Sequence, residues 1–190
     1  KKKAWALASM GQMYYNGEGV KQSYTMAKRL YDLAAQQGDV SAMLDLGSMY
    51  SFGRGVEQSY ERAKEYYEQA AQLGHAKAQY NLGQMYHHGH GVEQSYERAK
   101  EYYEQAAHLG HAQAQYNLGC LYANGQGVER DLEKARELMT KAAAQGHEKA
   151  IDGLQRIDIS EGRTTKRNTT ATISSSDPNE IVCSNCYAPK

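Results

Sequence analysis

Apolar residues recur along this chain at helical spacing, in pairs of segments separated by glycine. Ala78, Leu82 and Met85 fall at i, i+4 and i+7, which places them on one face of an α-helix. Gly89 follows, and glycine readily takes the positive φ of a helix C-terminus. Ser95 is predicted to be the N-cap of a second helix. The second apolar stripe consists of Tyr96, Ala99, Tyr102, Tyr103, Ala106 and Ala107. The pattern predicts a hairpin of two helices, each of roughly 12–15 residues.

The hairpin pattern occurs four times, with a period of 36 residues. Sixteen of the 18 glycines fall in four columns at this spacing, and residues 56–83 and 92–119 are identical at 26 of 28 positions. The four glycine columns start at Gly11, Gly17, Gly19 and Gly38. One pair of short helices cannot bury its apolar faces alone, so neighbouring copies must stack on one another. The sequence therefore predicts an all-α fold of about four helix-turn-helix repeats.

One glycine column lies inside the first helix of each pair, and Gly83 is its copy in the third repeat. Glycine costs about 1 kcal/mol relative to alanine at such a position. We expect it to allow close approach of the paired helix, where Ala99 and Ala106 are also small. We expect the tyrosines to act as large spacers, with their hydroxyl groups at the edge of the core.

These features together resemble the Sel1-like repeat family, which is related to the tetratricopeptide repeats. The pattern is A-x-Y-N-L-G-x-x-Y-x-x-G-x-G-V, then A-K-x-Y-Y-x-x-A-A-x-x-G-H-x-x-A, and the resemblance covers residues 4–158. The third repeat carries it on Ala78, Tyr80, Asn81, Leu82, Gly83, Tyr86, Gly89, Gly91, Val92, Ala99, Lys100, Tyr102, Tyr103, Ala106, Ala107 and Gly110. The resemblance implies a right-handed α-solenoid with a concave face. It also implies an adaptor or scaffold, as family members are in signalling, protein quality control and bacterial–host contact.

The domain organisation follows from the repeat register. Repeats are predicted at about 4–38, 39–74, 75–110 and 111–146, with a capping helix at 147–158. In the cap, Gly153 and Gln155 break the register of the helix glycine. Residues 159–182 have no apolar period and are predicted to be a disordered linker. Residues 183–190 form a tail with a C-x-x-C motif.

Charge and composition exclude several classes of protein. Among 190 residues, 22 basic side chains balance 22 acidic ones, which argues against a nucleic-acid-binding protein. No run of 18 apolar residues occurs, so we expect no membrane span. We expect a monomer, and a cytoplasmic location is favoured although the sequence leaves the compartment unknown.

Motifs for catalysis are absent from the sequence. There is no nucleophile elbow, no phosphate loop before a helix and no H-E-x-x-H, so we predict that the protein is not an enzyme. A cysteine-rich bacterial branch of the resembling family has been linked to β-lactam binding. This chain has three cysteines and lacks the regular pairs of that branch, which leaves a β-lactam-binding or hydrolysing enzyme as a remote alternative.

The concave surface is the predicted binding site, because the first helix of each pair lines that side in the related helical repeats. Its non-consensus columns are then free to contact a partner. The predicted binding residues are Asp45, Ser48, Tyr80, Asn81, Gln84, His87, Tyr116, Asn117 and Cys120. Amide groups pair with an extended peptide backbone, and tyrosine supplies rigid contact area. For Asn81 and Asn117 the alternative is a structural hydrogen bond to a neighbouring helix.

Two groups of residues suggest metal binding. His87, His88 and His90 surround Gly89, and we interpret them as solvated loop histidines because that glycine should end the helix. Cys183 and Cys186 have the spacing of half a tetrahedral zinc site. Their surroundings resemble the first knuckle of a MYND-type zinc finger, without a second knuckle. We therefore expect no cofactor unless a completed finger binds zinc.

The sequence as a whole predicts a non-catalytic scaffold that binds a peptide or protein surface in its concave groove. The alternative is a regulatory adaptor in which a C-terminal zinc finger, incomplete here, recruits a second partner.

Overall fold

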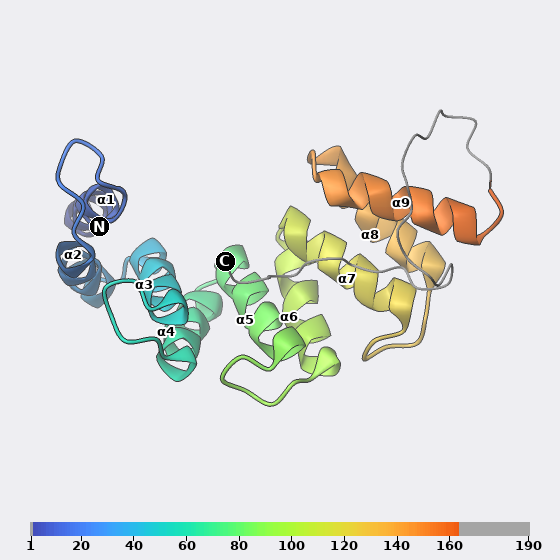
Figure 1. Cartoon of the computed structure of the whole chain (residues 1–190), viewed down its shortest axis with the longest axis horizontal. Helices are drawn as coiled ribbons and strands as arrows, with labels where there is room; N and C mark the ends of the chain where they lie inside the picture. Colours follow the sequence, from blue (N-terminus) through green and yellow to red (C-terminus); the bar gives the residue numbers. More distant parts are fainter. Residues whose placement is uncertain (1, 164–190) are drawn as a thin grey trace. The chain divides into compact units, whose positions relative to one another are not determined.

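The computed structural model describes residues 2–163, and within them every regular element is an α-helix (Figure 1). The helices are α1 (Lys2–Asn16), α2 (Tyr24–Gln36), α3 (Val40–Phe52), α4 (Tyr60–Gln72), α5 (Ala76–His88), α6 (Tyr96–His108), α7 (Ala112–Asn124), α8 (Leu132–Ala144) and α9 (Glu148–Ser160). Four helix-turn-helix repeats followed by a capping helix confirm the predicted fold class, an α-solenoid. Residues 164–190, which include Cys183 and Cys186, lie outside the described part.

The helix ends form where the sequence pattern predicts them. Side chains of Ser23, Ser59, Ser95 and Asp131 accept hydrogen bonds from backbone N–H groups three residues later, at the starts of α2, α4, α6 and α8. Such N-caps satisfy donors that the first turn of a helix leaves without a partner. Gly53, Gly89 and Gly125 end α3, α5 and α7 in the left-handed conformation. Local sequence signals therefore set the starts of the second helices and the ends of these first helices.

The chain divides into two compact units. Unit 1 comprises Lys1–Gln94 and contains α1 to α5, and unit 2 comprises Ser95–Lys190 and contains α6 to α9. In unit 1, α1 packs on α2, α2 on α3, α3 on α4 and α4 on α5. In unit 2, α6 packs on α7, α7 on α8 and α8 on α9.

In unit 1 the helix glycines permit close packing of tyrosine rings. A Cβ atom on Gly11 would lie 2.7 Å from Cε1 of Tyr31, and one on Gly47 would lie 2.5 Å from Cε1 of Tyr67. The expected close approach of paired helices is thus confirmed at these two copies of the column. The tyrosine rings lie inside the core, because Tyr31 and Tyr67 are almost fully buried. The tyrosines of this column are the large spacers that the sequence predicts, but their hydroxyl groups are buried with the rings and do not lie at the core edge.

In unit 2 a methionine takes the place of the ring. Met139 is fully buried, and its side chain faces two glycines, Gly119 of α7 and Gly153 of α9. The shifted register of Gly153 suggested an interruption of the packing pattern. No interruption occurs, because the glycine has no side chain and leaves room for Met139. Arg136 of α8 pairs with Asp158 and Glu161, which adds ionic contacts between α8 and the end of the capping helix.

Among residues 2–163, no helix is both long enough and apolar enough to cross a membrane.

Candidate partner-binding surface

The predicted binding residues of unit 1 lie on the first helices of its repeats. We call this surface the first-helix face, and define it by Ser9, Gln12 and Tyr15 on α1, Asp45, Ser48 and Ser51 on α3, and Tyr80, Asn81, Gln84 and His87 on α5. Register brings these residues to equivalent positions, since each column recurs every 36 residues.

Asp45 contributes to packing between repeats. The hydroxyl of Tyr31, on the preceding helix, lies close enough to the Asp45 carboxylate to lower its pKa. Burial raises the pKa of Asp45 to about 6, while Lys77 opposes the rise and Asp39 adds to it. The same burial raises the pKa of Tyr31.

Ser48 also forms hydrogen bonds within its own repeat. Its Oγ donates to the backbone oxygen of Leu44 at 3.1 Å and accepts from the hydroxyl of Tyr67 at 3.4 Å. The hydroxyl is therefore engaged within the repeat.

A row of polar side chains runs along α5. Nε2 of Gln84 donates to the hydroxyl of Tyr80 at 2.6 Å, and Nε2 of His88 donates to Oε1 of Gln84 at 3.0 Å. The three residues are spaced by four, so they lie one above another on the helix. Asn81 is half-buried beside this row, and within residues 2–163 its side chain forms no hydrogen bond. The row holds its polar groups in fixed orientations next to an available amide.

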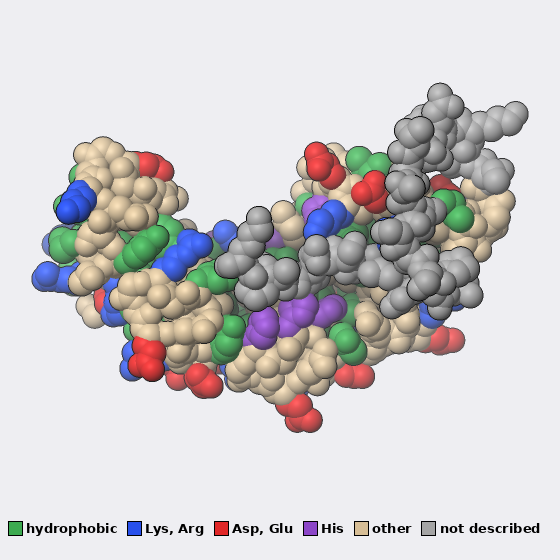
Figure 2. Space-filling model, in the orientation of Figure 1, with side chains coloured by type: hydrophobic (Ala, Val, Ile, Leu, Met, Phe, Trp, Pro, Cys, Tyr) green, Lys and Arg blue, Asp and Glu red, His purple; other side chains and the backbone are tan. Residues whose placement is uncertain are grey.

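Three histidine rings meet at the end of α5. The ring centroids of His87 and His88 are 4.7 Å apart, and those of His88 and His90 are 5.4 Å apart. Tyr60 of α4 stacks on His90 with centroids 5.1 Å apart. Figure 2 shows histidine side chains gathered on one part of the surface. Sequence reasoning did not predict this cluster, because His88 and His90 come together only through the turn after α5.

Burial keeps the inner rings of this cluster uncharged at neutral pH. It lowers the pKa of His87 to about 4, with a further contribution from His88. Burial and the neighbouring His90 also lower the pKa of His88. The interpretation of all three as solvated loop histidines is therefore wrong for His87 and His88, which belong to the last turn of α5 and are half-buried. In the described part of the chain, no three His, Cys, Asp or Glu side chains form a group that could hold a metal ion.

An arginine that the sequence analysis did not single out lies at the opposite end of the first-helix face. Nη1 of Arg54 donates to the hydroxyl of Tyr15 at 2.5 Å. Its guanidinium lies 5.7 Å from the ring centroid of Tyr15 and 5.5 Å from that of Phe52. Cation–π contacts hold the guanidinium over these rings. The signal in the sequence was weak, since Arg54 falls between the two glycines of a turn.

In unit 2 the predicted residues lie deeper. Asn117 and Cys120 of α7 are buried, whereas Tyr116 is half-buried. The ring of Tyr116 stacks on His147, at the start of α9, with centroids 4.7 Å apart. In unit 2, therefore, one of the three predicted partner-binding residues is partly exposed, and the other two lie in the core.

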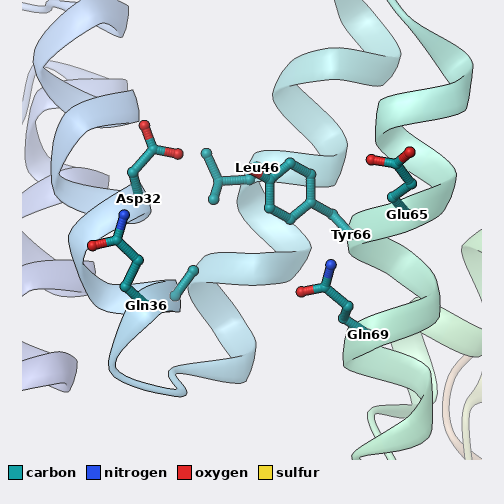
Figure 3. Close-up of a pocket in the computed structure, with 7 residues that line it drawn as sticks. Asp32, Gln36, Leu46, Glu65, Tyr66 and Gln69 are labelled. Atoms are coloured by element: carbon teal, nitrogen blue, oxygen red, sulfur yellow. The ribbon is translucent and has the colours of Figure 1, made fainter.

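A cavity of about 290 Å³ opens between the second helices of unit 1 (Figure 3). Asp32 and Gln36 of α2 form one wall, and Glu65 and Gln69 of α4 form the other. Its remaining lining residues are Ala35, Leu46 and Tyr66. The sequence analysis did not predict this cavity, because its two walls come from different repeats.

Comparison with known proteins agrees with the repeat register. The Sel1 repeat model matches residues 6–39, 40–75, 76–111 and 112–147. A search of curated proteins found no match. The repeat matches end at residue 147, before the C-x-x-C tail, so the zinc-finger resemblance stays a prediction.

Solved structures similar to this chain are Sel1-like. A protective antigen present in uropathogenic Escherichia coli strains, which displays an SLR fold, is 32% identical with a TM-score of 0.78, over 87% of this chain and 35% of the antigen. A Sel1 repeat protein from Oxalobacter formigenes is 28% identical with a TM-score of 0.78, over 87% of this chain and 66% of that protein. Cysteine rich protein B of Helicobacter pylori is 25% identical with a TM-score of 0.54, over 66% of this chain and 95% of that one.

This chain therefore spans about a third of the antigen and two thirds of the Oxalobacter protein. Because the repeat matches cover residues 6–147 without a gap and the helices follow the same register, the chain belongs to the Sel1 repeat family.

Proposed function

We propose that this protein is a non-catalytic scaffold whose first-helix face in unit 1 binds an extended peptide or a protein surface. Sel1 repeat proteins are typically protein-interaction scaffolds. The observation that carries the finer proposal is the row Tyr80–Gln84–His88, with Asn81 beside it. Such a row offers donors and acceptors whose positions are already set.

The mechanism of binding is presentation of a preformed surface. The internal hydrogen bonds of Gln84 restrict its rotamers before a ligand arrives, so less conformational entropy is lost on binding. The second N–H of Gln84 and the amide of Asn81 supply hydrogen bonds to a peptide backbone. Tyr80 and the neutral His87 and His88 rings supply flat contact area with little loss of freedom.

Charge on this face extends the range of contacts. Arg54 is held over Tyr15 and Phe52, so a cation is presented at a fixed place near the C-terminal ends of α1 and α3. A carboxylate on the ligand pairs with such a guanidinium. Ser48 supports the face from within, because its side chain bonds to Leu44 and Tyr67.

The test is selection of peptides from a random library displayed against the full chain, followed by affinity measurement. Fluorescence anisotropy of a selected peptide should show at least a tenfold loss of affinity in the N81A/Q84A variant, or about 1.4 kcal/mol. The control is Gln72→Ala, which removes an exposed amide from the second-helix side of α4. Equal affinity of N81A/Q84A and the control would contradict the proposal, as would failure to select any binding peptide.

A further inference from the structure

The cavity between α2 and α4 is lined by polar groups with unused hydrogen-bonding capacity. Within residues 2–163, the Glu65 carboxylate and the amides of Gln36 and Gln69 form no hydrogen bond or ion pair. The Asp32 carboxylate pairs with Lys28, with Oδ2 of Asp32 2.7 Å from Nζ of Lys28. A carboxylate has about four acceptor sites, so Asp32 keeps capacity for further donors. The two walls therefore both present acceptors, and each wall carries one carboxylate (Figure 3).

An aromatic ring belongs to the same cavity. Tyr66 lines it and stacks on Tyr50, with ring centroids 5.8 Å apart and planes 10° apart. Burial raises the pKa of Tyr66, and the negative charge of Asp32 adds to the rise. The carboxylate therefore acts on the space that the ring occupies. A carboxylate next to an aromatic ring favours a cation, because both attract positive charge.

The equivalent positions of unit 2 already hold a cation. Glu137 and Lys141 of α8 lie two repeats after Glu65 and Gln69. Nζ of Lys141 is 2.6 Å from Oε1 of Glu137. Unit 1 thus keeps the carboxylate of this pair but has an amide in place of the ammonium group.

Two further cations of α4 are engaged elsewhere. Nη1 of Arg62 donates to the hydroxyl of Tyr50 at 3.1 Å, and Nζ of Lys64 lies 3.4 Å from Oε1 of Glu68. The volume of the cavity, about 290 Å³, is at the small end of the range for ligand sites. It therefore suits one side chain or another small group better than a large molecule.

We propose that this cavity is a binding site for the guanidinium group of an arginine side chain presented by a partner protein. A guanidinium has five N–H donors in one plane, so it pairs with Asp32 on one wall and with Glu65 on the other. Tyr66 supplies an aromatic surface on which a guanidinium stacks. An ammonium group is a compact point charge and suits a single carboxylate, as Lys141 does with Glu137.

This site lies apart from the surface of the proposed function. Its walls are formed by α2 and α4, whereas the first-helix face lies on α1, α3 and α5. Either site can therefore fail a test without affecting the other. A partner that inserts an arginine here gains a point of attachment on the second helices of unit 1.

The test is titration of the isotope-labelled full chain with the capped peptide acetyl-Gly-Arg-Gly-amide, followed by NMR of backbone amides. Saturable shifts should centre on α2 and α4, with a Kd in the millimolar range. The same peptide with citrulline in place of arginine keeps the shape and loses the charge, so it should bind at least fivefold more weakly. A lysine peptide should bind at least threefold more weakly, because one ammonium group does not span both walls.

Two variants assign the binding to the cavity. Glu65→Gln removes one negative charge and should weaken binding at least fivefold. Gln69→Lys recreates the ion pair of unit 2, so the new ammonium group should occupy the carboxylate and weaken binding at least tenfold. Circular dichroism checks that both variants keep the helix content of the wild type.

Matched controls separate this site from others. Glu137→Gln removes an exposed carboxylate at the equivalent position of unit 2, and should leave the affinity within twofold of the wild type. N81A/Q84A should also leave it unchanged, which distinguishes failure here from failure of the proposed function. Free L-arginine should bind within threefold of the capped peptide, because only the guanidinium enters the cavity.

Several results would overturn the proposal. Absence of saturable shifts on α2 and α4 is one, and equal binding by Glu65→Gln and the wild type is another. Equal binding of the citrulline peptide would assign the cavity to uncharged polar ligands, and equal binding of the lysine peptide would show that it reads charge alone. Free L-arginine that binds at least tenfold more tightly than the capped peptide would assign the site to a free amino acid.

Discussion

The junction of α2 with α3 and the junction of α8 with α9 occupy equivalent places in the repeat register but use different side chains. At the first, the Tyr31 ring packs on Gly11, and its hydroxyl lies near the Asp45 carboxylate of the next repeat. At the second, Met139 lies in the position of Tyr31, and Gly153 lies in the position of Asp45.

The difference shows that three positions act as one packing unit. A tyrosine brings a hydroxyl into the interior, and a buried hydroxyl needs a hydrogen-bond partner on the facing helix. A methionine needs none, so its neighbour is free to be a glycine that makes room for the thioether. The polar residue Asp45 is thus matched to the ring that faces it at this junction, whereas the Tyr67 hydroxyl of the next repeat bonds to Ser48 of its own hairpin.

The largest expected effect is a loss of stability when a helix glycine that faces a rigid tyrosine ring is replaced by alanine. Gly11→Ala places a Cβ atom 2.7 Å from Cε1 of Tyr31, a ring that is 1% exposed. We expect a net loss of about 2 kcal/mol, because overpacking outweighs the gain in helix propensity. Amide hydrogen exchange in α1 and α2 measures it.

The matched control for that substitution is Gly153→Ala, whose Cβ atom would meet Sδ of Met139 at 2.6 Å. The end of a methionine side chain rotates away at small cost, so α8 and α9 should lose less than about 1 kcal/mol. Equal losses in the two variants would show that ring and thioether constrain these junctions alike.

Removal of one hydroxyl tests the polar half of the α2–α3 junction. Tyr31→Phe should lower the free energy of unfolding by about 1.5 kcal/mol at pH 7, since the Asp45 carboxylate loses a donor. Urea unfolding followed by circular dichroism measures the change. Tyr14→Phe, on half-buried Tyr14 of α1, is the control and should change stability by less than about 0.5 kcal/mol.

Replacement of the Asp45 carboxylate by an amide tests whether burial raises the pKa of Asp45. Asp45 has an ordinary pKa of 3.8, raised by burial to about 6 in the folded protein. Between these pH values the folded state therefore binds more protons than the unfolded state. The free energy of unfolding of the protein falls as the pH rises through that window, because Asp45 becomes charged while buried. Asp45→Asn should stabilise the protein by about 1 kcal/mol at pH 7.

The gain from Asp45→Asn should shrink as the pH falls from about 6 to below 4, where the native aspartate is already protonated. Unfolding curves of both proteins across this range provide the measurement. A gain that is independent of pH would show that the amide acts through packing and not through charge.

The smallest expected effect comes from converting one junction into the other. Met139→Tyr alone brings a hydroxyl to a site without its acceptor, and Gly153→Asn alone crowds Met139. The double variant M139Y/G153N should be more stable than the sum of the single changes by about 0.5–1 kcal/mol. Urea unfolding of all four proteins gives this coupling. Additive losses would argue that the three positions do not act as one unit.

Much of the fold was predictable from the sequence because its signals are local. The N-caps at Ser23 and Asp131, the left-handed glycines such as Gly89 and the apolar stripes all depend on residues within a few positions of one another. The period of 36 residues then requires stacking of hairpins, since a single hairpin cannot bury its stripes.

The candidate site was predictable only as a set of columns. Sequence register placed Asn81 and Gln84 on the first-helix face, but the bonds of Gln84 to Tyr80 and His88 depend on side-chain rotamers. The half-burial of His87 and His88 was missed because their rings pack on one another and on His90, and His90 in turn stacks on Tyr60, which is distant in sequence. The cavity between α2 and α4 was missed for the same reason, since its two walls come from different repeats.

By itself, the sequence determined the family, the helices, their ends and the residues that face inward, because period, propensity and capping act over short distances. Only the tertiary structure decided which residues at equivalent repeat positions are buried and which are exposed. Met10 and Leu46 occupy the same column, yet one is exposed and the other buried, because α2 packs against α3 and no described helix packs against the outer side of α1. Burial depends on what lies next to a side chain, and that neighbour is often a residue far away in the chain.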